Sequence, residues 1–207
     1  MDVFVPFDAV DPKSRLGELF TPDERRGLAM AMLTDVLEAI HASGHRPYVL
    51  STAPIDTDAT VIIDERDLTT AVNSMLELHD PPMAIVMADL PLLGAGTVDR
   101  LVEAPGDVVL APGIGGGTNA FVTRDPAFST DFHGCSIRDH ADIAAEADLE
   151  IRYVDSYRLS LDIDEIDDLV EVLLHAEGET NRWLVDHDVT IAEDENGRVS
   201  VERNARD

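Results

Sequence analysis

The stretch Met83-Ala84-Ile85-Val86-Met87-Ala88-Asp89-Leu90-Pro91 decides the fold. Its first five residues are apolar without alternation, which is typical of a strand that is covered on both faces of a sheet. Such strands occur in α/β folds, where helices lie against both faces. Since ligands bind at the carboxyl edge of these sheets, we expect Asp89, which closes the strand, to lie at a binding edge.

Strand and helix signals before this stretch support the same fold class. Three short apolar runs predict strands, at residues 3–7, 48–51 and 60–63. Thr21, Pro22 and Glu24 supply an N-cap, an N1 proline and a capping-box acid, and they predict a helix that ends near Gly44. Asp67 predicts the start of a second helix, which continues to residue 78. The order of these elements is that of a doubly wound sheet.

After the central stretch, strand signals and helix signals continue to alternate along the chain. We expect strands at residues 108–111, 118–123, 151–154 and 159–161, and helices at 137–147 and 164–174. Asn196-Gly197 lies between two short apolar runs and predicts a β-hairpin. The chain should therefore form a doubly wound, mostly parallel α/β sheet in residues 1–176. A C-terminal helix and β-hairpin appendage should occupy residues 177–207.

The charge balance excludes several function classes. The 207 residues include 42 acidic and 15 basic side chains, which gives a net charge of −27. Such a field repels duplex DNA and anionic membranes, so neither is expected as a partner. An acidic disordered protein is also excluded, because segments with helix and strand periods recur throughout the chain. A folded enzyme in a high-salt cytoplasm fits best, since molar salt screens charge over about 3 Å.

Other features of the composition agree with a cytoplasmic protein. No apolar run approaches the roughly 20 residues of a membrane helix, and residues 1–7 lack the layout of a signal peptide. The lone Cys135 excludes an internal disulfide, and we expect it to be a small buried side chain. Lys13 is the one lysine among fourteen arginines. Its retention makes it a candidate for binding phosphate, which a compact ammonium does well.

Three aspartates are candidates for a metal site. Asp89 ends a buried strand, while Asp162 and Asp164 are separated by one residue and would share a face of an extended segment. Mg²⁺ binds through carboxylates and takes its other ligands from water and substrate phosphates. In a chain this acidic, such pairs also occur on solvated surfaces, and that alternative stays open on spacing alone.

Two loops are candidates for binding anions. Residues 113–117 read Gly-Ile-Gly-Gly-Gly, and their backbone N–H groups can approach an anion closely. They match neither the dinucleotide fingerprint nor the Walker A loop, and a mobile turn between two strands is the alternative. Residues 132–136 precede a helix whose N-terminus, with the Ser136 hydroxyl, could bind phosphate or carboxylate. Ser136 could equally be only an N-cap.

Four motifs in this order resemble the 2-phospho-L-lactate guanylyltransferase family of coenzyme F-420 biosynthesis. They are Lys13-Ser14-Arg15-Leu16, Met87-Ala88-Asp89-Leu90-Pro91-Leu92, Gly115-Gly116-Gly117-Thr118-Asn119-Ala120 and Asp162-Ile163-Asp164. The resemblance covers residue 3 to about residue 174 and implies a GT-A nucleotidyltransferase fold for the catalytic domain at 1–176. It further implies that GTP is joined to a phosphorylated lactate, that pyrophosphate is released and that a divalent metal, Mg²⁺, is needed.

The resemblance also implies roles for individual residues. The metal would be held by Asp89, Asp162 and Asp164. The nucleotide would be contacted by Lys13, Arg15, Gly115 and Gly116. The phosphorylated acid would be contacted by Thr118, Asn119, Gly134 and Ser136. Catalysis would depend most on Lys13, Arg15 and Asp89.

Several alternatives remain beside this interpretation. The acceptor could be phosphoenolpyruvate or 3-phosphoglycerate. A transferase for a molybdenum cofactor or a sugar phosphate should carry a glycine-rich loop after the first strand, whereas residues 8–12 contain no glycine. A non-catalytic nucleotide-binding module would bind GTP without releasing pyrophosphate. The hairpin at residues 189–201 could pair between subunits of a homodimer, because its edge is exposed.

Overall fold

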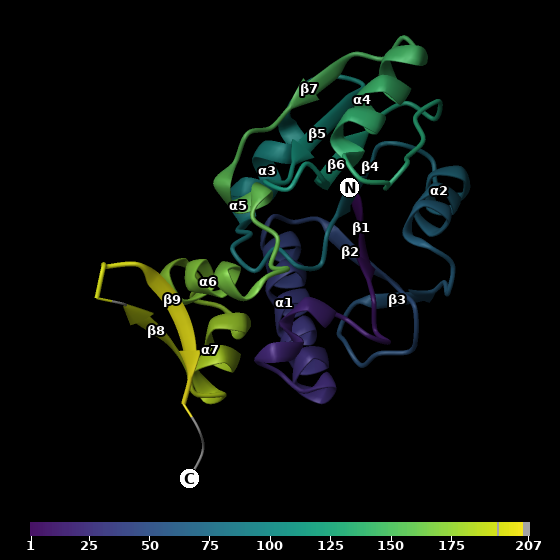
Figure 1. Ribbon diagram of the computed structural model, residues 1–207. Helices are drawn as coiled ribbons and strands as arrows, with labels where there is room; N and C mark the ends of the chain where they lie inside the picture. The colour runs from purple at the N-terminus through teal and green to yellow at the C-terminus, as the bar shows by residue number, and fades with distance from the viewer. Residues whose placement is uncertain (194, 205–207) are drawn as a thin grey trace.

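The computed structural model describes residues 1–193 and 195–204. Within this part, seven strands form one sheet in the order β3-β2-β1-β4-β6-β5-β7, and β8 and β9 form a separate hairpin (Figure 1). The strands of the main sheet are β1 (Asp2–Phe7), β2 (Arg46–Ser51), β3 (Thr60–Ile63), β4 (Met83–Val86), β5 (Val108–Pro112), β6 (Thr118–Thr123) and β7 (Ile151–Tyr153). The doubly wound α/β prediction is confirmed.

Strand direction brings several loops to one edge of the sheet. β1 is parallel to both neighbours, with Val3 opposite Pro47 of β2 and Ala84 of β4. β6 alone is antiparallel, to β4 and to β5. The carboxyl ends of β1, β4 and β5 therefore lie at the same edge as the amino end of β6. From β1 the chain passes to β2 on one side, while β4 lies on the other, so this edge is a topological switch point, where ligands bind in such folds.

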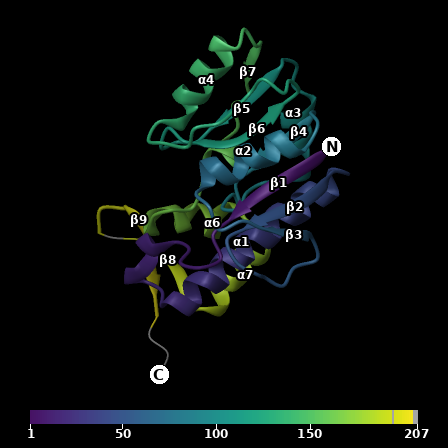
Figure 2. The same ribbon diagram turned by 90° about the vertical axis from the view of Figure 1, so that its right-hand side faces the viewer.

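Helices cover both faces of the sheet. They are α1 (Pro22–Ala42), α2 (Leu68–Leu78), α3 (Ala95–Glu103), α4 (Ser136–Glu146), α5 (Tyr157–Ser160), α6 (Leu169–His175) and α7 (Glu179–Asp186). Side chains alternate along β1, so Val3 and Val5 pack in one core cluster with α1 and α3, while Phe4 packs in the other with α2 and α4. Figures 1 and 2 show α1 and α2 on opposite sides of the sheet.

The predicted start of α1 is confirmed. The Thr21 hydroxyl accepts a hydrogen bond from the Glu24 backbone N–H, the Glu24 carboxylate accepts one from the Thr21 N–H at 2.8 Å, and Pro22 begins the helix. This reciprocal cap satisfies backbone donors that a helix start otherwise leaves free. α1 is thereby fixed directly after the loop that follows β1 and the 3₁₀ turn η1 (Ser14–Glu18).

The C-terminal elements pack on the free side of α1. Leu184 of α7 and Val189 of β8 (Val189–Glu193) belong to the same core cluster as the buried residues of α1. Asp35 of α1 accepts a hydrogen bond from the Thr180 backbone N–H at 2.9 Å and so caps α7 across the chain. The hairpin is completed by β9 (Val199–Arg203). A division at residue 176 stays a prediction, and residues 194 and 205–207 of the appendage lie outside the described residues.

Two predicted elements differ from the structure, and one helix was missed. Residues 159–161 are not a strand: α5 is a helical turn, in which the Leu159 and Ser160 N–H groups bond back to the Ser156 carbonyl. The helix predicted at 164–174 begins later, with the 3₁₀ turn η2 (Ile166–Asp168), and continues as α6. α3 was not predicted, because Gly94 and Gly96 at its start mask the helical pattern. Among the described residues, no helix has both the length and the apolar character to span a bilayer.

Candidate active site

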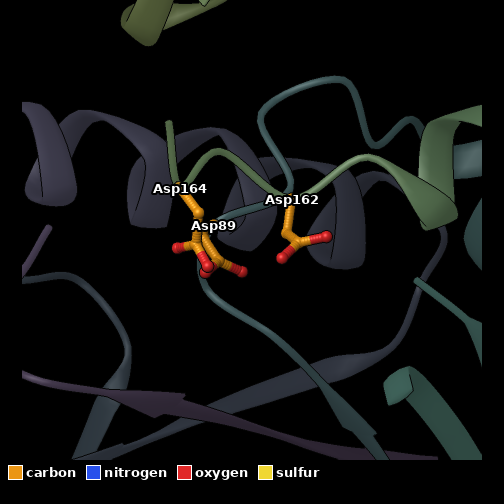
Figure 3. A group of neighbouring side chains, drawn as sticks. All are labelled: Asp89, Asp162 and Asp164. Atoms are coloured by element: carbon orange, nitrogen blue, oxygen red, sulfur yellow. The ribbon is translucent and has the colours of Figure 1, made fainter. Parts of the chain in front are cut away.

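The three candidate metal ligands lie together at the switch-point edge. Asp89 follows β4 by three residues, and Asp162 and Asp164 follow α5. The two segments are joined by a backbone hydrogen bond of 3.1 Å from Ile163 N–H to the Asp89 carbonyl. Figure 3 shows the three carboxylates pointing into one common space. One oxygen of each lies within 4.8 Å of one oxygen of each of the others.

Lys13 supplies the positive charge nearest to this cluster. Its ammonium donates to Asp89 Oδ2 at 2.6 Å and to Asp164 Oδ1 at 2.8 Å, and its side chain is 11% exposed. Burial lowers the pKa of Lys13, but the charges of Asp89 and Asp164 outweigh burial and hold the pKa above its ordinary value. Lys13 is therefore a cation held between the carboxylates of Asp89 and Asp164. Its backbone is in the left-handed region, with φ 53°, where the chain turns into η1.

Arg15 adds a second, exposed cation. Its guanidinium lies 3.3 Å from Asp164 Oδ2 and 3.4 Å from Glu165 Oε1, and its side chain is 64% exposed. Solvent screens these pairs, so their contribution to stability is small. An arginine that remains this exposed is free to reorient toward an incoming anion.

The cluster has the chemistry of a divalent-cation site. Within the described part of the chain, the buried Asp89 Oδ1 has no hydrogen-bond partner. Burial raises the pKa of Asp162 above its ordinary value, although the hydrogen bond from Asn119 acts in the opposite direction. A buried acceptor without a partner is costly unless something positive meets it, and carboxylate oxygens are the ligands that hard divalent cations prefer. Asp89, Asp162 and Asp164 could therefore hold such a metal.

A cavity of about 340 Å³ adjoins the cluster. Its walls come from the end of β1, the loop that follows β1, α1, the segment that follows β4, and Asp164. The lining includes four of the predicted site residues, Lys13, Arg15, Asp89 and Asp164. The two cations and the cavity thus lie on the same side of the cluster, where a polyphosphate would meet both.

Asn119 lies beside the metal candidates. This buried residue of β6 donates from Nδ2 to Asp162 Oδ1 at 3.0 Å. The Asn119 amide therefore orients a carboxylate of the cluster. Gly113 makes room for it, because a Cβ at Gly113 would lie 2.5 Å from Asn119 Oδ1.

Thr118 and Ser136 meet on the other face of the sheet. The Ser136 hydroxyl accepts a hydrogen bond of 2.9 Å from the Thr118 backbone N–H, and both residues are buried. Ser136 is the first residue of α4, and Cys135 occupies the N-cap position, so Ser136 is not the N-cap. The expectation that Cys135 is buried is wrong, since it is exposed. The short loop before α4 faces solvent and leaves the thiol outside.

The predicted glycine positions lie in turns around this pair. Gly115 and Gly116 belong to the turn between β5 and β6, and the Gly116 carbonyl accepts a hydrogen bond from Ile137 N–H at 3.3 Å. Gly116 has φ 86° and Gly134 has φ 49°, conformations that favour glycine. The glycine turn is thus held against the start of α4. Sequence reasoning missed His140, one turn further along α4, whose ring contacts Thr118 and which no local motif marks.

The α/β sheet with one antiparallel strand, and the aspartate cluster at its switch point, match the fold of GT-A-like nucleotidyltransferases. Solved structures show the same fold. One is described as a nucleotide-diphospho-sugar transferase from Desulfovibrio desulfuricans G20, with 16% identity, a TM-score of 0.72 and coverage of 90% of this chain and 94% of that one. A nucleotidyl transferase from Methanothermobacter thermautotroptrophicus has 14% identity, a TM-score of 0.60 and coverage of 90% and 99%.

The chain belongs to the family described as "Guanylyl transferase CofC like", which matches residues 1–204. Relatives named 2-phospho-L-lactate guanylyltransferase agree. The protein of Halomicrobium mukohataei is 52% identical over 205 residues, with coverage of 98% of this chain and 100% of the relative. The protein of Haloferax volcanii is 50% identical over 207 residues, with full coverage of both chains. The family expected from the four motifs is confirmed.

Proposed function

We propose that this chain is a 2-phospho-L-lactate guanylyltransferase, which joins GTP to 2-phospho-L-lactate and gives lactyl-2-diphospho-5'-guanosine and pyrophosphate. The observation that carries the proposal is the cluster of Lys13 with Asp89 and Asp164 beside a cavity that Arg15 also lines. The names of full-length relatives at about half identity supply the substrates. They favour 2-phospho-L-lactate over phosphoenolpyruvate and 3-phosphoglycerate.

The reaction is a displacement at phosphorus. An oxygen of the acceptor's phosphate forms a bond to the α-phosphorus of GTP. The bond from that phosphorus to the oxygen bridging to the β-phosphate breaks, and pyrophosphate leaves with the electron pair. The attacking phosphate is already an anion at neutral pH, so no general base is needed. The protein must instead align two polyanions and neutralise their charge.

The site residues divide these tasks. Lys13 and Arg15 bind the triphosphate and stabilise the leaving pyrophosphate, with Gly115 and Gly116 contacting the nucleotide. Mg²⁺ held by Asp89, Asp162 and Asp164 would supply the positive charge that balances the phosphates. The acceptor lies at Thr118, Gly134 and Ser136. Asn119, assigned to the acceptor from the sequence, serves it indirectly, because its amide holds Asp162.

A second cavity gives the nucleoside room. It has a volume of about 330 Å³ and shares Phe7, Asp8 and Met87 with the first. Its lining is more apolar and includes Leu50 and Ala71. A base placed there would pack against apolar walls, while its phosphates would lie in the first cavity.

The acidic surface suits a high-salt cytoplasm. The relatives compared above come from haloarchaea. At a net charge of −27, molar salt is needed to screen the repulsion between surface carboxylates. Homodimer formation through the edge of the β8–β9 hairpin stays a prediction.

Pyrophosphate release tests the proposal. The protein is assayed in molar KCl with Mg²⁺, each nucleoside triphosphate and, in turn, 2-phospho-L-lactate, phosphoenolpyruvate and 3-phosphoglycerate. We expect the highest kcat/KM with GTP and 2-phospho-L-lactate. A preference for another acid would reassign the acceptor. Binding of GTP without pyrophosphate release from any pair would show a non-catalytic module.

A further inference from the structure

His140 of α4 is a buried titratable residue with no part in the reaction as described above. Its side chain is fully buried, and the rings of Phe121, Phe128 and Phe132 surround it, with the Phe132 ring centroid at 4.8 Å. Burial lowers the pKa of His140 to about 4, so the ring is neutral at neutral pH. A neutral ring carries one proton, on either Nδ1 or Nε2.

The ring makes one polar contact among the described residues. Nδ1 lies 2.8 Å from the Thr118 hydroxyl oxygen, whereas Nε2 is buried without a hydrogen-bond partner. Buried N–H donors without partners are rarer than acceptors without partners. The proton therefore belongs on Nδ1, which donates to Thr118 and leaves only a lone pair on Nε2 facing the phenylalanine rings.

This tautomer decides what the Thr118 hydroxyl can do. When Nδ1–H donates to the Thr118 oxygen, the hydroxyl keeps its own hydrogen for another acceptor. The opposite tautomer would take that hydrogen and leave only lone pairs, which repel an anion. The Ser136 hydroxyl supports the same arrangement. Its oxygen accepts from the Thr118 N–H at 2.9 Å, and its hydrogen is donated to the Thr118 hydroxyl oxygen at 3.4 Å, so the hydrogen of Thr118 itself is left for another acceptor.

We infer that His140 is a positioning residue of the acceptor site, which orients the Thr118 hydroxyl so that Thr118 donates a hydrogen bond to the phosphate of the acceptor acid. The inference rests on the proposed function, which places the acceptor at Thr118. His140 acts through Thr118 and does not touch the substrate.

Three substitutions at His140 separate positioning from packing. His140→Phe fits the aromatic surroundings but removes the contact to Thr118. His140→Asn places an amide near the position of Nδ1, and His140→Gln places one near the position of Nε2. We expect the KM for 2-phospho-L-lactate to rise about tenfold in the Phe and Gln variants, as for the loss of one useful hydrogen bond, and to return to within about twofold in the Asn variant. The KM for GTP should not change in any of them.

A double-mutant cycle tests whether His140 acts through Thr118. Thr118→Val removes the hydroxyl, so adding His140→Phe should raise the acceptor KM no further. Independent effects of the two substitutions would overturn the inference. An acceptor KM in His140→Phe equal to that of the wild-type protein would also overturn the inference. So would a His140→Phe variant that differs from wild type by a lowered Tm alone.

The tautomer can be measured without turnover. Nitrogen-15 NMR of the wild-type protein should show the His140 proton on Nδ1, and a proton on Nε2 would overturn the inference. If the wild-type protein released no pyrophosphate with any acid, the proposed function would fail. The NMR measurement would still decide separately which nitrogen of His140 carries the proton.

Discussion

The Asn119 side-chain amide donates to Asp162 Oδ1 at 3.0 Å, so an uncharged residue of β6 fixes one of the three clustered carboxylates. Residues that hold a metal-binding carboxylate in place affect the site nearly as much as the ligands do. The hydrogen bond also connects the cluster to β6, whose first residue, Thr118, contacts α4.

Gly113→Ala should disturb this hydrogen bond. The new Cβ would lie 2.5 Å from Asn119 Oδ1, so the amide must move away from Asp162. We expect the affinity for Mn²⁺, measured by calorimetry with GTP present, and kcat/KM to fall about 10- to 100-fold. Gly117→Ala is the matched control, because its Cβ would lie at an ordinary 3.8 Å from the same oxygen. Equal losses in both variants would show that loop flexibility, rather than Asn119, matters.

Asp89→Asn should abolish turnover and leave the fold intact. The substitution keeps the shape of the side chain but removes a charge from the cluster and from the contact to Lys13. We expect kcat to fall by about 10³-fold or more, with an unchanged circular dichroism spectrum. Asp142→Asn, at an exposed position of α4, is the control for the loss of one negative charge. A near-normal rate in Asp89→Asn would remove the metal assignment.

Lys13→Met should weaken both triphosphate binding and turnover. It leaves Asp89 and Asp164 without their shared cation, so we expect kcat/KM for GTP to drop roughly 10²- to 10³-fold. Lys13→Arg should restore little, because the planar guanidinium does not fit where a compact ammonium meets two carboxylates. Steady-state kinetics with GTP as the varied substrate measure the effect. Full activity of Lys13→Arg would mean that charge alone is required.

Acid should break the link between the hairpin and α1. The hydrogen bond from Arg203, together with the Thr21 N–H, lowers the pKa of Glu24 from 4.5 to about 2. A carboxyl group whose pKa falls on folding adds stability above its unfolded pKa and loses it as the pH drops through the folded pKa. Glu24→Gln should therefore cost about 1 kcal/mol at neutral pH, and the difference in Tm from wild type should shrink between pH 4.5 and pH 2. Glu38→Gln, at an exposed position of α1, should show no such dependence.

Gly178→Ala should destabilise the packing of α7 on α1. A Cβ there would collide with the Asp35 carboxylate, which accepts hydrogen bonds from Thr180 N–H and Thr180 Oγ1. We expect a loss of about 1–3 kcal/mol in the free energy of unfolding, with unchanged kcat per folded molecule. Gly96→Ala, which adds its Cβ into open space in α3, should be neutral or slightly stabilising. An unchanged Tm in Gly178→Ala would contradict this role of Asp35.

Local signals in the sequence predicted most of the fold. The capping residues around Pro22 and the unbroken apolar run of β4 each specify a structure within a few residues, and both predictions are confirmed. α5 was misread because Leu159 and Leu161 alternate as in a strand, while a segment of four residues cannot show a helical period. The conformation of α5 depends on its tertiary contacts, which a local sequence pattern does not predict.

The site was predictable only in part. Asp89 could be placed by the strand before it, and Lys13 by its rarity, but the meeting of Asp162 and Asp164 with Asp89 depends on contacts between segments more than 70 residues apart. The hydrogen bond of Asn119 to Asp162 and the contact of His140 with Thr118 are likewise long-range. Their residue types also occur in ordinary structural roles, so only the folded chain distinguishes them.

Because the chain has a single lysine, one labelled residue can report on the binding edge of the sheet. Since Lys13 carries the one ε-amino group and is 11% exposed, protein grown with isotopically labelled lysine would report from this one position. The arrival of a nucleotide, a cation or an acceptor could then be followed in one resonance. No assignment of the remaining 206 residues would be required.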